Sequence, residues 1–288
     1  MKLSSLYNQA IKLGRLHDPR GNRPWQYADT AVLFGDSNTE VRKILVGIDI
    51  DIGELLLADR LRQKDGLDLV IAHHPQGKAL AHYYEVMRLQ IDLLKKVGIN
   101  PQVARQLVEE RYAEVQRKIL PVNHMRTQDA ATLLRLPFMC LHTPADNHAS
   151  FFIQGLLEKN RPKRLQDIIR ILELIPEYRE AKRNHVGPRI VLGNSRSWVG
   201  KIFVEMTGGT EGSKRAFDKL AKKGVRTLVS MHLSEEHFSK VKEANLNVVI
   251  AGHISSDTLG LNLLLDGIEK QERLDIISCS GFRRLRRI

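Results

Sequence analysis

Short apolar runs rich in β-branched residues alternate with longer amphipathic stretches along most of the chain. This alternation is typical of α/β architecture, in which helices connect the strands of a sheet. The apolar runs predict strands at residues 30–34, 44–48, 68–72, 138–141, 189–192, 202–206, 227–231, 247–251 and 274–279. The amphipathic stretches predict helices at 4–13, 53–64, 82–97, 101–119, 145–158, 165–174, 212–222, 235–244 and 257–271.

The length of 288 residues suits one large domain or two modest ones. Weakly patterned stretches near 121–129 and 183–188 are both candidate boundaries, and the pattern does not separate them. We predict a first α/β domain over 1–130, with a helical hairpin at about 79–119. The second α/β domain covers 131–288, and its C-terminal part could return to the first.

Composition narrows the class of protein further. The chain carries a net charge of +12 and has only two cysteines. Two widely separated cysteines argue against a disulfide framework and a cysteine-rich zinc module. No run of 18 apolar residues occurs, so no membrane span is predicted, and residues 1–14 are typical of an amphipathic helix rather than a signal peptide. We therefore expect a cytoplasmic protein.

The excess of basic residues predicts attraction to phosphate groups, on nucleotides or on nucleic acid. A solvated basic face is the alternative, and the charge pattern alone does not decide between them. Part of the excess lies in two clusters, formed by Lys159, Arg161, Lys163 and Arg164 and by Arg283, Arg284, Arg286 and Arg287.

Three predicted strands end in histidine. These histidines are His73 and His74 after 67–72, His142 after 136–141, and His253 after 248–251. Ligands of open α/β sheets gather at the carboxyl ends of strands. His142 and His253 are each followed four residues later by an aspartate, Asp146 and Asp257, a spacing that places two side chains on one face of a helix. Imidazole with carboxylate suits Zn, Mn or Fe as divalent ions.

Each motif alone also has a structural explanation. The paired histidines could be turn residues, and the aspartates could cap helices. The repetition favours metal binding, because independent structural histidines rarely occupy three strand ends. Four histidines and two carboxylates are too many for one zinc ion and predict two divalent metal ions. Such a pair would activate water and hold a phosphoryl or similar oxygen.

Other polar residues at strand ends are weaker candidates. His232 follows the run 228–231 and could contact substrate or donate a proton, with surface exposure as the alternative. Asp49 and Asp51 could orient the imidazoles, or cap the end of their strand.

A glycine-rich loop at 207–213 follows a predicted strand and opens a helix. Its backbone N–H groups could bind an anion, and a plain tight turn is the alternative. The loop lacks the Gly-Lys-Ser/Thr sequence of a Walker loop. The candidate anion-binding residues are Gly208, Gly209, Thr210, Gly212 and Ser213.

The motifs occur in the order His-His-Pro, His-Thr-x-x-Asp, Gly-Gly-Thr-x-Gly-Ser and Gly-His-x-x-Ser-Asp, within about residues 41–260. This ordered set resembles the Ngg-one-interacting-factor-three family, dinuclear-metal proteins also labelled GTP cyclohydrolase 1 type 2 homologues. The resemblance implies two interlinked α/β domains with mostly parallel or mixed sheets flanked by helices, and a metal site between them. It also implies a toroidal hexamer with two adjacent divalent metals inside the ring.

By this resemblance the metal ligands are His73, His74, His142, Asp146, His253 and Asp257. Asp257 stands where the family usually has glutamate, and the shorter side chain predicts a second metal that is shifted, more weakly held or bridged by water. His232 lies in a segment that replaces the Thr-Gly-Asp of the family, so the substrate chemistry is expected to differ.

Two functional hypotheses follow. The first is a metal-dependent hydrolase of a nucleotide-like or phosphate-bearing substrate, for which the family label is GTP ring opening. The second is a non-enzymatic hexameric ring that acts as a nucleic-acid- or protein-binding regulatory scaffold. A metal-stabilised scaffold without a substrate is a third interpretation.

Overall fold

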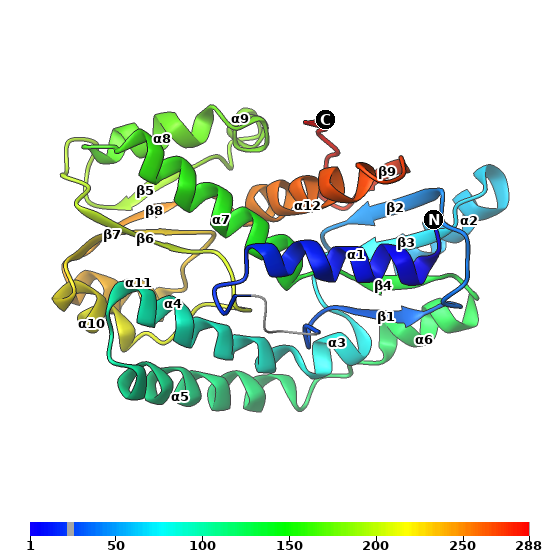
Figure 1. Cartoon of the computed structure of the whole chain (residues 1–288), viewed down its shortest axis with the longest axis horizontal. Coiled ribbons are helices and arrows are strands. Elements are labelled where there is room, and N and C mark those ends of the chain that lie inside the picture. Colours follow the sequence, from blue (N-terminus) through cyan, green and yellow to red (C-terminus); the bar gives the residue numbers. More distant parts are fainter. Residues whose placement is uncertain (22–25, 288) are drawn as a thin grey trace. The chain divides into compact units, whose positions relative to one another are not determined.

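The structure is a computed structural model that describes residues 1–21 and 26–287 (Figure 1). Contacts divide the chain into two units, each assembled from separated segments. The first unit contains Met1–Val86, Val115–His148 and Asp257–Ile288, and the second contains Met87–Glu114 and Ala149–Ser256. The division at residue 130 remains a prediction.

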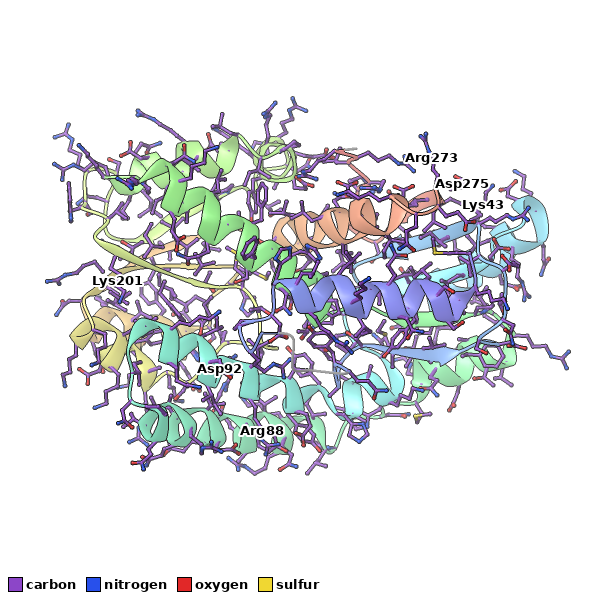
Figure 2. The ribbon with its side chains drawn as sticks, viewed as in Figure 1. Lys43, Arg88, Asp92, Lys201, Arg273 and Asp275 are labelled. Carbon is purple, nitrogen blue, oxygen red and sulfur yellow. The ribbon has the colours of Figure 1, made fainter. Side chains whose placement is uncertain are left out.

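The first unit is built on a five-stranded mixed sheet. Its strands, in spatial order, are β1 (Ala31–Phe34), β4 (Phe138–Cys140), β3 (Leu69–Ala72), β2 (Lys43–Gly47) and β9 (Asp275–Cys279). β1 runs antiparallel to β4, and the other neighbours are parallel. Lys43 and Asp275 are partners in the β2–β9 pair, and their charged groups lie 3.1 Å apart (Figure 2). The helices within this unit are α1 (Leu3–Leu16), α2 (Ile52–Asp65), α3 (Gly77–Ala81) and α6 (Arg126–Leu133).

The strand β3 shows why the apolar runs form the centre of this sheet. All four of its residues are buried, as expected of a parallel strand that is covered on both faces. Because successive side chains point to opposite faces, Leu69 and Ile71 pack in one cluster with residues of α1. Val70 and Ala72 pack in another cluster with Leu55 of α2. The sheet is therefore held between helices.

The second unit contains a four-stranded sheet. Its strands, in spatial order, are β5 (Arg189–Leu192), β8 (Asn247–Ile250), β7 (Val225–Ser230) and β6 (Lys201–Glu205). β5 is antiparallel to β8, and the other pairs are parallel. Phe217, Leu228 and Val248 are among the buried residues of its core. The helices within this unit are α4 (Leu89–Val97), α8 (Leu165–Glu173), α9 (Pro176–Arg183), α10 (Ala216–Lys222) and α11 (Glu235–Glu243).

The boundaries of the units fall inside regular elements. The chain passes from one unit to the other within η1 (Tyr83–Arg88), α5 (Pro101–Ile119), α7 (Thr143–Asn160) and α12 (His253–Glu269). Because each boundary lies inside a helix, the amino-acid composition does not change there. A linker sequence therefore does not mark the points where the chain passes between the units.

The prediction of an α/β fold with mixed sheets flanked by helices is confirmed. Each predicted strand overlaps a strand of the structure. The predicted helix at 82–97 forms as η1 followed by α4, and the sequence pattern missed α3, α6 and α9. These three helices have 5, 8 and 8 residues, which is too short for a clear helical periodicity. None of the described helices has the length and hydropathy needed to cross a membrane.

Candidate metal centre

Two neighbouring strands of the first unit bring three histidines together. β3 ends at Ala72 and continues into His73 and His74, and β4 ends at Cys140, two residues before His142. The two strands are parallel partners with Ala72 opposite Cys140, so their carboxyl ends meet at the same edge of the sheet. The ring centroids of His73 and His142 consequently lie 4.8 Å apart.

His73 occupies the centre of this cluster. Its side chain is fully buried, and its Nδ1 lies 3.0 Å from the carbonyl oxygen of Leu141. Its Nε2 lies 3.3 Å from Oδ1 of Asp146 and 3.5 Å from Oδ1 of Asp257. Within residues 1–21 and 26–287, the buried Nε2 of His73 and Oδ1 of Asp146 have no hydrogen-bond partner. Buried polar atoms without a hydrogen bond are rare and indicate a missing bound group.

The spacing of these atoms fits a metal ion. In a tetrahedral site with bonds of about 2.1 Å, neighbouring ligand atoms lie roughly 3.4 Å apart. The two carboxylate contacts of His73, at 3.3 and 3.5 Å, match this separation. In the described part of the chain, two groups of three residues could hold an ion: His73, His74 and Asp257, and His73, His142 and Asp146.

Asp257 lies between two imidazoles. While its Oδ1 faces His73, its Oδ2 lies 3.4 Å from Nε2 of His74. The Nδ1 of His74 lies 2.6 Å from Oδ1 of Asp49, which orients the ring. The shorter aspartate side chain therefore still reaches both histidines, with one oxygen toward each.

Asp29 orients the third imidazole. Its Oδ2 lies 2.7 Å from Nδ1 of His142 and also accepts a hydrogen bond from the hydroxyl of Thr143 at 2.6 Å. The hydroxyl of Thr30 donates to Oδ1 at 3.2 Å, and Asp29 has no exposed surface. A carboxylate on Nδ1 directs Nε2 of the histidine to a metal and increases its basicity.

Carboxylates dominate the electrostatics of the cluster. Burial by itself lowers the pKa of His73, but Asp257 and Asp146 outweigh burial and raise this pKa well above 6.5. Burial also lowers the pKa of His74, and the hydrogen bond with Asp257 is among the contacts that raise it above its usual value. To bind a divalent cation, the ligating nitrogens of these imidazoles must be deprotonated.

Two more histidines meet in the second unit. The ring centroids of His232 and His253 lie 4.6 Å apart, and the side chain of His232 is 43% exposed. Oε1 of Glu211 lies 3.7 Å from Nδ1 of His232 and accepts a hydrogen bond from the backbone N–H of Ser234 at 2.5 Å. Burial raises the pKa of Glu211, but His232 and Ser234 outweigh it and lower this pKa to about 2. Glu211 is therefore an anion beside His232.

The glycine-rich loop contacts a carboxylate of the protein itself. The backbone N–H of Gly212 donates to Oε1 of Glu205 at 3.3 Å. The side-chain amide of Gln90 donates to the carbonyl oxygen of Gly208 at 2.9 Å. Burial, followed by the charge of Glu211, raises the pKa of Glu205 to about 7. One N–H group of the predicted anion site is thus engaged within the chain.

No protein-family model matches the chain, and no curated protein matches it. Among solved structures, a NIF3 superfamily protein from Sphaerobacter thermophilus has 28% identity and a TM-score of 0.81, covering 98% of this chain and 99% of that one. This chain belongs to the NIF3 superfamily. The family predicted from the ordered motifs is confirmed.

Two further solved structures share the fold with this NIF3 superfamily chain. Reduced HcgD from Methanocaldococcus jannaschii has 16% identity and a TM-score of 0.58, covering 96% of this chain and 97% of that one. The protein ybgI, described as of unknown function, has 17% identity and a TM-score of 0.56, covering 99% of this chain and all of that one. At these identities the similarity shows the fold alone.

The superfamily motifs supply most of the cluster. The predicted ligands that the first unit brings together are His73, His74, His142, Asp146 and Asp257. His253 begins α12, four residues before Asp257. Its role as a ligand remains a prediction, as do the roles of His232 and the glycine-rich loop. Of the two candidate orienting residues, Asp49 contacts His74, whereas Asp51 caps α2 through the N–H of Ile52 at 2.8 Å.

Asp29 is the residue of this superfamily member that sequence reasoning missed. It precedes the edge strand β1 instead of following a strand, and its only signal is a polar Asp-Thr pair just before an apolar run. We expect Asp29→Asn to weaken binding of Zn²⁺ about 10- to 100-fold, because the neutral amide no longer fixes and polarises His142. Competition with a chelating dye measures this, with exposed Asp36→Asn as the control. Equal affinity in both variants would contradict the orienting role of Asp29.

Proposed function

We propose that this protein binds two divalent metal ions and hydrolyses a phosphate-bearing, nucleotide-like substrate. The observation that carries the proposal is the convergence of three imidazoles and two carboxylates, with the imidazoles following the carboxyl ends of β3 and β4 and the carboxylates on α7 and α12. Two buried atoms of this cluster, Nε2 of His73 and Oδ1 of Asp146, form no hydrogen bond within the described residues. Donors of this kind suit Zn, Fe or Mn.

The number of available nitrogen atoms supports two ions. His73 can bind metal only through Nε2, because its Nδ1 faces the carbonyl of Leu141. His73 can therefore be a ligand of one ion. We assign to that ion His73, His142, Asp146 and Oδ1 of Asp257. We assign to the second ion His74, Oδ2 of Asp257 and His253. His253 and Asp257 are four residues apart on α12, a spacing that places both side chains on one face of the helix.

Bound divalent ions supply Lewis acidity toward a phosphoryl group and lower the pKa of water. The glycine-rich loop is our candidate for holding the phosphate. Its consecutive glycines Gly208 and Gly209 have φ of +92° and +85°, a conformation that side chains disfavour. The backbone N–H of Gly212 already donates to Glu205. We therefore assign the anion to the backbone N–H groups of Gly208, Gly209, Thr210 and Ser213.

His232 is our candidate for the proton donor to the leaving group. Its Nδ1 faces the ionised Glu211, which can accept the Nδ1 proton, so to act as the donor the ring must carry a second proton on Nε2 and pass that proton to the leaving group. Its partial exposure gives a substrate access to the ring. Glu211 then acts as a positioning residue.

Turnover by metal-loaded protein tests the proposal, with GTP, GMP and p-nitrophenyl phosphate as substrates. We expect His142→Ala to lose metal and turnover together. We expect His232→Ala to keep its metal and lose about 10²- to 10⁴-fold in kcat, the range for loss of a general acid. Exposed His185→Asn is the control, because asparagine tolerates the positive φ of 64° at that position. Metal-loaded wild type that turns over none of these substrates would refute hydrolysis.

Assembly is a separate part of the proposal. We infer a homo-oligomer, a ring of six copies, from the membership of the superfamily and the resemblance of the motifs. Sedimentation velocity on the full chain tests it: a species of six subunits is expected, and a monomer at micromolar concentration would overturn it. A ring without turnover would favour the regulatory scaffold.

A further inference from the structure

The second unit carries a basic surface around an exposed tryptophan. Trp198 lies in the connection between β5 and β6 and is 59% exposed. The guanidinium carbon of Arg164 is 5.5 Å from the centre of its ring, and the same arginine donates to the carbonyl of Arg196 at 2.9 Å. We call this region the Trp198 surface. It consists of Trp198, Lys163, Arg164, Arg196, Lys201, Lys223 and Arg226, all of which are exposed.

Close contacts of backbone and side-chain atoms join these residues into one continuous region. The amino group of Lys201 donates to the carbonyl of Lys223 at 3.4 Å. A side chain on Gly200 would come within 2.6 Å of Arg226 and within 3.9 Å of Trp198. The backbone N–H of Val199 bonds to the carbonyl of Lys163 at 3.0 Å. Figure 2 shows Lys201 at the outer edge of this unit.

The Trp198 surface lies at the opposite end of the sheet from the candidate chemistry of the second unit. Lys201 is the first residue of β6, and Arg226 is the second residue of β7. The side-chain amide of Asn247, which begins β8, donates to the carbonyl of Trp198 at 3.0 Å. These are the amino ends of the parallel strands, whereas His232 follows the carboxyl end of β7. A ligand here would be independent of the proposed hydrolysis.

We propose that the Trp198 surface binds single-stranded nucleic acid, with phosphates against its cations and a base stacked on Trp198. Single-strand sites combine a cationic track with an aromatic side chain on which a base stacks. In a duplex the bases are stacked inside, so the ring would have no base to contact. An acidic peptide would use the cations alone and would leave the apolar ring exposed.

Fluorescence anisotropy with a fluorescein-labelled 20-nucleotide oligothymidylate measures this binding, and a duplex of equal length is the comparison. We expect Trp198→Ala to weaken binding of the single strand roughly 5- to 150-fold, the effect of losing one stacked base. Trp198→Phe keeps an aromatic ring and should retain most of the affinity. The side chain is exposed, so both variants are expected to fold.

Charge reversal tests the cations. We expect Arg164→Glu with Arg226→Glu to weaken binding and to reduce the slope of log affinity against log salt by about 1.4, or about 0.7 for each lost phosphate contact. The matched control is Arg60→Glu with Lys64→Glu on α2, which changes the net charge equally at exposed positions. Equal losses in the two double variants would show attraction by net charge alone and would overturn the proposal.

The fluorescence of Trp198 itself gives a second measurement. Trp25→Phe leaves Trp198 as the only tryptophan, and stacking of a base should quench its emission. Quenching should be equal in metal-loaded and metal-free protein, which separates this result from any failure of the hydrolase. Unchanged emission on binding, or a duplex that binds as tightly as the single strand, would overturn the proposal.

Discussion

Replacing His73 with alanine is expected to abolish tight binding of divalent metal. His73 contacts both carboxylates of the centre, Asp146 at 3.3 Å and Asp257 at 3.5 Å, and it belongs to both groups that could hold an ion. Losing a direct ligand should cost more than the 10- to 100-fold that is typical for an outer partner. Metal analysis by mass spectrometry, after loading with Zn²⁺, Mn²⁺ or Fe²⁺ and gel filtration, measures the ions retained per chain.

The control for this experiment is His124→Ala, because Nε2 of His124 lies 2.9 Å from the carbonyl oxygen of Ile119 and the residue is outside the cluster. Asp257→Asn provides a second variant of nearly the same shape, in case His73→Ala folds poorly. We expect it to lose metal as well, because it removes the charge that faces both His73 and His74. Full metal content in both cluster variants would show that the ions bind elsewhere.

Replacing Arg284 with alanine is expected to lower the free energy of unfolding by about 3–5 kcal/mol, the cost of breaking a buried ion pair. The guanidinium of Arg284 lies 2.5 Å from carboxylate oxygens of both Asp266 and Glu269. The exposed fractions of these three side chains are 4%, 8% and 1%. Removing the cation leaves two acidic groups close together in a poorly solvated place. Urea unfolding, with the slope checked for two-state behaviour, measures the change.

The neighbouring Arg283 is the matched control, because it is exposed and belongs to the same basic cluster of the sequence. Its replacement by alanine should change stability by less than about 0.5 kcal/mol. The pH dependence gives a further check. Burial raises the pKa of Glu269, but hydrogen bonds from Arg286 and Arg284 outweigh it and lower this pKa below 4.5. The stabilisation is therefore present above pH 4.5 and is lost as the pH falls further. If the free energies of unfolding of wild type and Arg284→Ala differed by the same amount at pH 7 and at pH 3, the ionised Glu269 could not be the source of the stabilisation.

The sequence predicted the strands well because each is a short apolar run with polar residues at its ends. β3 is the clearest case, since its four residues are all buried and His73 follows at once. The sequence predicted α5 over 101–119, which is where it forms, because Pro101 suits the first turn of a helix. It missed α9, where Pro176 begins a helix of only 8 residues.

The two basic clusters show a different limit. The sequence predicted that both were surface charge or phosphate sites, and it could not distinguish Arg284 from Arg283. The structure buries Arg284 against Asp266 and Glu269 of α12. It leaves Arg164 exposed beside Trp198. Burial of a long side chain depends on what packs over it, and that partner is remote in the chain.

The strands, the superfamily and the histidines at the strand ends could all be predicted from the sequence. These features depend on spacing along the chain, which covalent geometry converts directly into helical and strand faces. Two contacts could not be predicted in this way and are seen in the folded chain: Asp257 turns one oxygen toward His73 and the other toward His74, and Asp29 holds His142. Such contacts depend on the order of strands in the sheet, because the parallel pairing of β3 and β4 brings together residues that the sequence keeps far apart.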